Sequence, residues 1–241
     1  MADNGTFRRH ELKYLIDSRQ RRALERAMAG YMREDEYGES TICSLYYDTP
    51  DFRLVRRSME KPDYKEKLRL RSYGTARPDR DIFVELKKKY DGIVYKRRIS
   101  MAEKEATAWL AGREIHAPDS QIGREIRWFR DYYGELIPAM VLCYDRVAHF
   151  CPGDPDLRIT FDRNIRWRVT DLSLTRPAWG EPLLRPGWSL LEIKASSAMP
   201  LWLTRALSEN SIRQTSFSKY GTAYTVVQER NKRFKGDVHC A

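Results

Sequence analysis

The sequence predicts an α+β fold in which eight antiparallel strands close into a barrel and helices pack outside it. Two observations carry this prediction. Apolar and polar residues alternate along eight segments, as they do in strands that bury one face. Short turns join most of these segments, and stretches of helical periodicity lie between them. Because the chain shows no linker, repeat or low-complexity segment, we expect a single domain over residues 1–241 with a core of about 7–230.

The clearest predicted strand is Asp81–Lys89 (DIFVELKKK). Its apolar positions, which should pack under helices, are Ile82, Val84 and Leu86. The positions on its other face are Phe83, Glu85, Lys87 and Lys89. The same alternation predicts seven further strands, over Phe7–Ile16, Thr41–Asp48, Tyr64–Tyr73, Ile93–Ile99, Pro138–Phe150, Leu157–Ile165 and Ser189–Ser196. Turn signals such as Thr49-Pro50-Asp51 and Tyr90-Asp91-Gly92 end or join them.

Helix signals fall between the strands. Asp17 or Ser18 can cap a helix that runs to about Met32. A capping box at residues 100–103 (SMAE) predicts a helix that ends near Gly112. The other expected helices lie near Asp51–Met59, from Ser120 to about Tyr133, over Pro200–Leu207 and from Ser218 to about Arg230. We expect a loop over residues 170–187 and a frayed tail after Lys232.

The composition of the chain indicates which kind of partner it binds and in which compartment it is found. The net charge of +10 suggests a polyanion, either nucleic acid, a phosphate polymer or a membrane surface, and a merely solvated basic surface is the alternative. The four cysteines show no paired spacing, which indicates thiols of a reducing compartment. The N-terminus lacks a secretory signal, and the longest apolar run, about Ile137–Tyr144, is too short to span a bilayer. We therefore expect a soluble cytoplasmic protein or domain, with no transmembrane segment in this chain.

Charged side chains recur on one face of seven of the predicted strands. They are Glu11, Lys13, Arg69, Arg71, Glu85, Lys87, Lys89, Lys96, Arg98, Arg146, Arg158, Asp162, Glu192 and Lys194. Ten are basic and four are acidic, so lining a confined space with them is favourable only if that space is wet and an anion fills it. Arginine offers forked donors to phosphate oxygens, and a divalent cation could bridge the carboxylates to phosphate.

Other phosphate or catalytic motifs are missing from the sequence. No glycine-rich phosphate loop, zinc-ligand spacing or nucleophile elbow occurs. The four histidines, His10, His116, His149 and His239, are scattered, so we expect surface or packing roles for them. Charge along the strands is therefore the main functional signal.

Six short motifs occur in an order that is similar to a known family: residues 11–14 (ELKY), 67–74 (KLRLRSYG), 83–87 (FVELK), 96–98 (KRR), 191–194 (LEIK) and 217–220 (FSKY). The chain resembles the VTC-type polyphosphate polymerase domain, a branch of the triphosphate tunnel metalloenzymes in the CYTH-like superfamily. The resemblance covers about Phe7 to Val227. It implies an eight-stranded tunnel that binds ATP, inorganic polyphosphate or pyrophosphate, and Mn²⁺ or Mg²⁺, and that moves the γ-phosphoryl group of ATP onto a growing polyphosphate chain.

The resemblance also implies roles for individual residues. Catalytic phosphate contacts would come from Lys13, Arg69, Arg71, Lys87 and Lys219. Further substrate contacts would come from Lys96, Arg98, Arg146, Arg158, Lys194, Ser218 and Tyr144. Metal ligation would rest mainly on Glu192, with Glu85 and Glu11 as lesser candidates, and simple salt bridges are the alternative for Glu85 and Glu192. Independently of the family, Ser218-Lys219 opens a predicted helix, whose N-terminus favours an anion.

Two other functions stay open on the sequence. The same tunnel could hydrolyse tripolyphosphate or another triphosphate. A non-catalytic module that binds polyphosphate or nucleic acid is the other alternative, but base stacking needs aromatic residues on the basic face, where only Phe83 and Tyr144 occur. We therefore expect no nucleic-acid partner.

Overall fold

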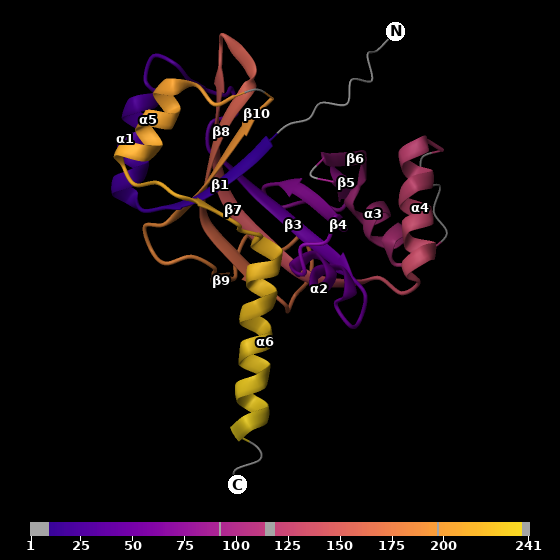
Figure 1. Ribbon diagram of the computed structural model, residues 1–241. Coiled ribbons are helices and arrows are strands. Elements are labelled where there is room, and N and C mark those ends of the chain that lie inside the picture. Colours follow the sequence, from indigo (N-terminus) through magenta and orange to yellow (C-terminus); the bar gives the residue numbers. More distant parts are fainter. Residues whose placement is uncertain (1–9, 92, 114–118, 197, 238–241) are drawn as a thin grey trace. The chain divides into compact units, whose positions relative to one another are not determined.

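The computed structural model describes residues 10–91, 93–113, 119–196 and 198–237 (Figure 1). Its longer strands are β1 (His10–Ile16), β3 (Ser40–Asp48), β4 (Tyr64–Tyr73), β5 (Asp81–Tyr90), β6 (Ile93–Ala102), β7 (Ile137–Cys151), β8 (Asp154–Arg168) and β10 (Ser189–Ala195). Two-residue strands are β2 (Arg33–Glu34), β9 (Glu181–Pro182) and β11 (Gln214–Thr215). The helices are α1 (Ser18–Met28), α2 (Arg53–Met59), α3 (Glu103–Leu110), α4 (Gln121–Tyr133), α5 (Leu201–Glu209) and α6 (Lys219–Asp237).

The strands pair in the order β11-β1-β10-β8-β7-β3-β4-β5-β6, with β2 beside β7 and β9 beside β8. The α+β class is confirmed, and the eight longer strands are the eight that alternation predicts. The closed barrel is not confirmed. In the described part of the chain the order of paired strands has two ends, β11 and β6, which do not pair with each other. The predicted strand start at Phe7, along with His116, His239 and Cys240, lies outside the described residues.

The described residues form two compact units. Unit 1 takes residues 10–41, 144–165 and 184–217, and unit 2 takes residues 42–143, 166–183 and 218–237. Each unit is therefore assembled from three separate stretches of chain, and β7 and β8 contribute residues to both. The single domain expected over residues 1–241 stays a prediction.

Unit 1 buries one face of its strands under two helices. β1, β8 and β10 supply a core that includes Tyr14, Ile159, Phe161, Leu191 and Ile193. α1 and α5 lie side by side (Figure 1). They cover this core with side chains such as Leu24, Leu203 and Leu207. Asp17 caps α1, and a reciprocal bond from the Gln20 side chain completes a capping box. The helix ends at Met28, four residues before the predicted end.

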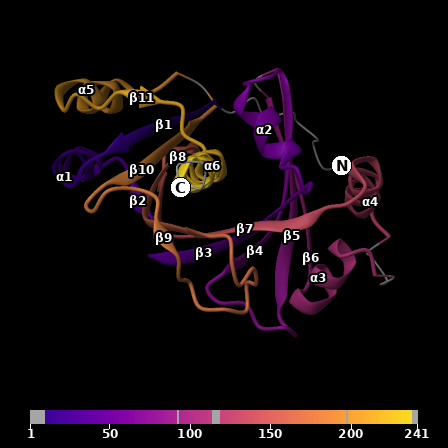
Figure 2. The ribbon, with the colours of Figure 1, turned by 90° about the horizontal axis from the view of Figure 1, so that it is seen from below.

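Unit 2 is built in the same way around β3 to β6. Alternate side chains of these strands form the core, which includes Leu45, Leu68, Leu70, Ile82, Val84 and Leu86. Trp109 of α3 and Phe129 of α4 belong to this core. Figure 2 shows where α3 and α4 lie in the ribbon. The predicted capping box at Ser100 is wrong, because β6 continues to Ala102 and the Ser100 hydroxyl donates to Asp81 instead. α3 begins at Glu103.

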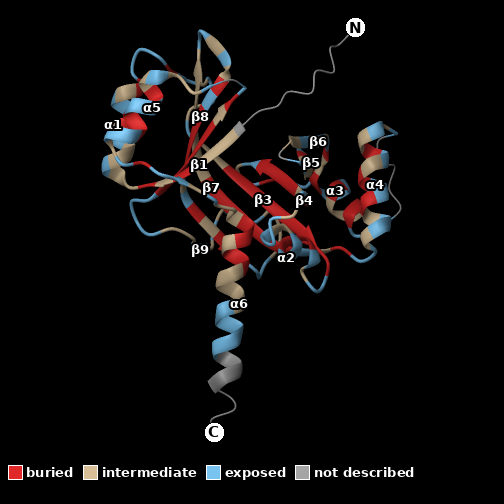
Figure 3. Ribbon diagram, viewed as in Figure 1, coloured by how far each residue is buried: buried red, intermediate tan, exposed pale blue. Residues whose placement is uncertain are grey.

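Helix α6 completes unit 2. Its first turns are buried through Tyr220, Ala223 and Tyr224, and residues 229–233 are exposed (Figure 3). The helix continues to Asp237, so fraying after Lys232 is not observed up to that residue. Within the described residues, none of the helices combines the length and the apolar composition that crossing a membrane requires.

Candidate functional site

The strand faces opposite both cores carry the predicted charged residues. In unit 2 they gather around Glu85 on β5, whose side chain is only 1% exposed. We call Glu85, Arg69, Arg71 and Lys96 the Glu85 cluster. The pairing of β5 with β4 and β6 brings charged side chains to Glu85, because Arg69 on β4 and Arg98 on β6 are its direct cross-strand neighbours. Side chains on the same face of paired strands lie close enough to interact.

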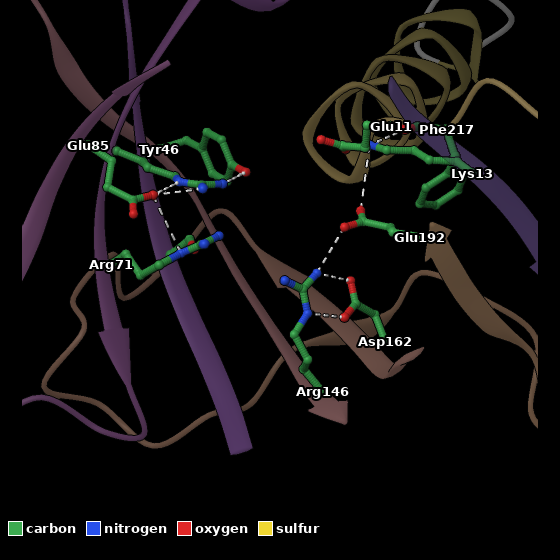
Figure 4. A network of polar contacts seen from close by, with 11 residues as sticks. Glu11, Lys13, Tyr46, Arg71, Glu85, Arg146, Asp162, Glu192 and Phe217 are labelled. Carbon is green, nitrogen blue, oxygen red and sulfur yellow. Dashed lines mark hydrogen bonds and ion pairs between the residues drawn. The ribbon is translucent and has the colours of Figure 1, made fainter. Parts of the chain in front are cut away.

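Three cations of the Glu85 cluster share the one carboxylate. Figure 4 shows the contact between Arg71 and Glu85. Arg69 donates from Nε and Nη2 to Glu85 Oε2, at 2.9 and 2.7 Å. Arg71 places Nε 3.8 Å from the same oxygen, and Lys96 places Nζ 2.6 Å from Oε1. The cluster therefore combines three positive charges with one negative charge.

The electrostatics of the cluster follow from this excess. Burial opposes ionisation of Glu85, but Arg69, Arg71 and Lys96 outweigh it and lower the pKa of the carboxyl to about 2. Burial also lowers the pKa of Lys96, and the neighbouring guanidinium groups add to that effect against the attraction of Glu85. The site thus holds more positive charge than its own carboxylate can stabilise.

Tyr46 on β3 extends the cluster. Its hydroxyl accepts a hydrogen bond of 2.9 Å from Arg69 Nη1, and its ring stacks on Tyr220 of α6 with a centroid distance of 4.6 Å. Burial would raise the pKa of Tyr46, but Arg69, Lys67 and Arg71 lower it to about 8. Sequence reasoning did not assign Tyr46 to the site. Its position opposite Arg69 in the β3–β4 register is the signal that finds it.

A row of three lysines lies beside the Glu85 cluster. Lys67 on β4 faces Lys87 on β5, and Lys87 faces Lys96 on β6. Like charges directly opposite each other on paired strands are destabilising. Lys67 also donates to Ser218 Oγ at 3.0 Å, and the same oxygen accepts the Gly221 N–H at the start of α6. The row therefore reaches a helix N-terminus, where an anion is favoured.

Unit 1 has its own group of charges, the Glu192 cluster: Glu11, Lys13, Arg146, Asp162 and Glu192. Arg146 donates from Nε and Nη2 to the two oxygens of Asp162, at 2.6 and 2.8 Å, and from Nη2 to Glu192 at 3.1 Å (Figure 4). Lys13 lies 3.2 Å from Glu11 and 3.6 Å from Glu192, and it donates to the Phe217 carbonyl at 3.2 Å.

The Glu192 cluster has the opposite charge balance. Its three carboxylates exceed its two cations by one, and the Asp162 side chain is fully buried. Burial opposes the charge of Arg146, but Tyr144, Asp162 and Glu192 outweigh it, so the pKa of the guanidinium lies well above its ordinary value. Sequence reasoning placed Asp162 on this face but gave it no role, and it is the two-point partner of Arg146.

These two environments differ as metal sites. Glu85 does not fit one, because three cations already surround its carboxylate. Glu192 and Glu11 fit better, since Mg²⁺ commonly takes one or two carboxylates and completes its shell with phosphate and water oxygens. In the described part of the chain, no three His, Cys, Asp or Glu side chains are grouped as a ready-made cage. Metal ligation by Glu192 and Glu11 stays a prediction.

The remaining predicted residues lie on or beside these faces. Arg98 is exposed and lies over the Phe83 ring at 4.6 Å, and Arg146 lies over the buried Tyr144 ring at 5.3 Å. In the strand register, Lys194 lies opposite Glu11 of β1 and opposite Arg158 of β8. Arg158 is exposed. Lys219 is half-buried at the first position of α6.

Comparisons with known proteins agree with this architecture. The family profile of the VTC domain matches residues 8–228. The vacuolar transporter chaperone complex subunit 4 of Schizosaccharomyces pombe is 25% identical over 79% of this chain and 32% of its own length. Subunit 2 from the same organism is 25% identical over 82% of this chain and 33% of its own length. The chain thus spans about a third of these curated relatives.

Among solved structures, a candidate adenylate cyclase from Bacillus halodurans has a similar fold, with a TM-score of 0.55 and 16% identity. The match covers 86% of this chain and 92% of that one. At this identity the likeness concerns the fold alone.

Proposed function

The chain belongs to the VTC domain family, and from that premise we propose that it is a polyphosphate polymerase. It would transfer the γ-phosphoryl group of ATP onto the end of an inorganic polyphosphate chain, with Mn²⁺ or Mg²⁺ bound. The observation that carries the proposal is the cationic face of unit 2, where a row of three lysines lies beside a carboxylate shared by three cations. A chain of phosphates supplies the negative charge that this face lacks.

Phosphoryl transfer needs positioning and charge neutralisation more than a protein nucleophile. A terminal oxygen of the acceptor polyphosphate attacks the γ-phosphorus, the bond to the β–γ bridging oxygen breaks, and ADP leaves. Arg69 and Arg71 would hold phosphate oxygens through forked donors, and Lys67, Lys87 and Lys96 would add point charges. Ser218 and Lys219 would bind a phosphate at the start of α6.

On the charged face of unit 1, Lys13, Arg146, Arg158 and Lys194 would contact phosphate. Glu192, with Glu11, would hold the divalent cation, which when bound neutralises charge on phosphate oxygens. We also propose the cytoplasm as the compartment, where ATP is available and where the buried thiols Cys43 and Cys143 stay reduced.

Nucleic-acid binding fits the charged faces less well. Their aromatic rings are already covered by arginines: Arg69 lies over Tyr46 at 5.7 Å, Arg98 over Phe83 at 4.6 Å and Arg146 over Tyr144 at 5.3 Å. A base would have to displace a guanidinium before it could stack.

The test is incubation of the purified protein with ATP and Mn²⁺, with gel detection of polymer and quantification of ADP. A polymerase forms long phosphate chains and ADP. ADP and orthophosphate without polymer indicate a hydrolase, and binding without turnover indicates a non-catalytic module. Arg71→Ala should lose turnover, whereas the matched variant Arg97→Ala should keep it, because Arg97 pairs with Glu125 of α4, away from the Glu85 cluster.

A further inference from the structure

Thr160 lies in the middle of the charged face of unit 1. Its neighbours along β8, Ile159 and Phe161, both pack into the core, so Thr160 projects to the opposite face with Arg158 and Asp162. Its cross-strand partner on β10 is Glu192.

That hydroxyl is buried and unbonded. Thr160 is 7% exposed, and within the described residues its Oγ1 makes no hydrogen bond. Buried polar atoms nearly always have a partner, and leaving one unsatisfied is costly. Thr41 in the same unit shows the usual arrangement, since its hydroxyl donates to Asp145 at 2.9 Å. In the ligand-free structure a valine would fill the Thr160 position equally well. We therefore expect the hydroxyl to form its hydrogen bond in another state of the protein, when a ligand is bound.

The Glu192 cluster indicates what that state is. Lys13 and Arg146 both contact the Glu192 carboxylate, and both are cations that a phosphate ligand attracts. When phosphate draws them away, Glu192 loses these two charge contacts while it remains buried at 6% exposure. An additional donor then stabilises the buried carboxylate. The Thr160 side chain is within cross-strand reach.

We propose that Thr160 is a positioning residue for Glu192: in the state with both phosphate and the divalent cation bound, its hydroxyl donates to the Glu192 carboxylate and fixes its orientation. The inference rests on the proposed function, because it requires phosphate binding at unit 1 and a metal-holding role for Glu192. Hydrogen bonds from neighbouring side chains commonly orient carboxylates that hold metals in this way.

The experiment compares Thr160→Val and Thr160→Ser with the wild type. Thermal unfolding is measured without ligand, and tripolyphosphate affinity is measured by calorimetry with and without Mg²⁺. We expect Thr160→Val to unfold at the wild-type temperature or above, because no hydrogen bond is lost. With Mg²⁺ its tripolyphosphate affinity should fall about tenfold, as for loss of a hydrogen bond to a charged group. Without Mg²⁺ the loss should shrink, and Thr160→Ser should bind like the wild type.

Thr41→Val is the matched control. It removes a bonded hydroxyl, so it should lower the unfolding temperature and leave tripolyphosphate affinity unchanged. Wild-type affinity in Thr160→Val, or a loss of thermal stability as large as that of Thr41→Val, overturns the inference. An equal loss of affinity with and without Mg²⁺ also overturns it, because it places the hydroxyl on phosphate and not on Glu192. If the wild type itself binds no tripolyphosphate, the proposed function and the inference fail together.

Discussion

Replacing Glu85 by glutamine removes the carboxylate that Arg69, Arg71 and Lys96 share and leaves the shape of the side chain unchanged. The structure gives the size of the effect. The three cations lower the pKa of Glu85 from 4.5 to about 2, a shift worth about 3 kcal/mol. Because the folded-state pKa is the lower one, this stability is fully present above pH 4.5 and is lost as the pH falls through about 2.

At pH 7, Glu85→Gln should therefore lower the free energy of unfolding by about 3 kcal/mol, or the melting temperature by on the order of 10 °C. The same change should strengthen tripolyphosphate binding about fivefold, since a unit charge about 4 Å away is worth about 1 kcal/mol even in bulk water. A residue that held a metal or contacted substrate productively would give weaker binding when removed.

The assays are urea unfolding at pH 7 and calorimetric titration with tripolyphosphate. Glu125→Gln is the control, because Glu125 pairs with Arg97 on the outside of unit 2. It should change stability by less than about 0.5 kcal/mol and leave binding unchanged. Unaltered stability in Glu85→Gln, or weaker tripolyphosphate binding, would refute the view of Glu85 as an internal counter-ion.

Three further substitutions test other parts of the two faces. Arg146→Ala leaves the buried Asp162 and Glu192 carboxylates without their guanidinium and should lower the free energy of unfolding by about 3–5 kcal/mol in urea titration; wild-type stability would contradict this. Tyr46 has a pKa of about 8, so tripolyphosphate affinity should fall between pH 7 and 9 as the phenolate forms, and Tyr46→Phe should abolish that step. Lys67→Met should weaken tripolyphosphate binding about tenfold and reduce the salt dependence of binding. Thermal stability should not fall, because the change relieves like-charge repulsion between Lys67 and its cross-strand neighbour Lys87. Unchanged binding would remove Lys67 from the site.

The strands were predictable because each has one face against a core. In Asp81–Tyr90 the alternation of Ile82, Val84 and Leu86 with charged residues is a direct consequence of burial on one side. The strands β2, β9 and β11 were not predictable, since two residues cannot display a period of two. The Ser100 capping box failed because strand pairing with β5 continues through Ala102.

Which charges share a face could also be predicted, but not which charges pair. That three cations converge on Glu85 depends on the register of β4, β5 and β6, which no local pattern fixes. The same holds for Asp162, whose partner Arg146 lies on another strand. Sequence reasoning put metal ligation mainly on Glu192 and kept Glu85 as a lesser candidate. Their environments differ in the charges nearby, because three cations surround Glu85, whereas Glu192 shares its two cations with the carboxylates of Glu11 and Asp162.

The most direct test of the central claim is calorimetric titration of the wild type with tripolyphosphate, beside a variant in which Lys67, Lys87 and Lys96 are all methionine. The cationic face of unit 2 predicts saturable binding by the wild type that ATP competes for and single-stranded DNA does not, and a loss of at least about a hundredfold in the triple variant. Equal binding by the two proteins, or displacement of tripolyphosphate by single-stranded DNA, would contradict the claim that this face binds a chain of phosphates.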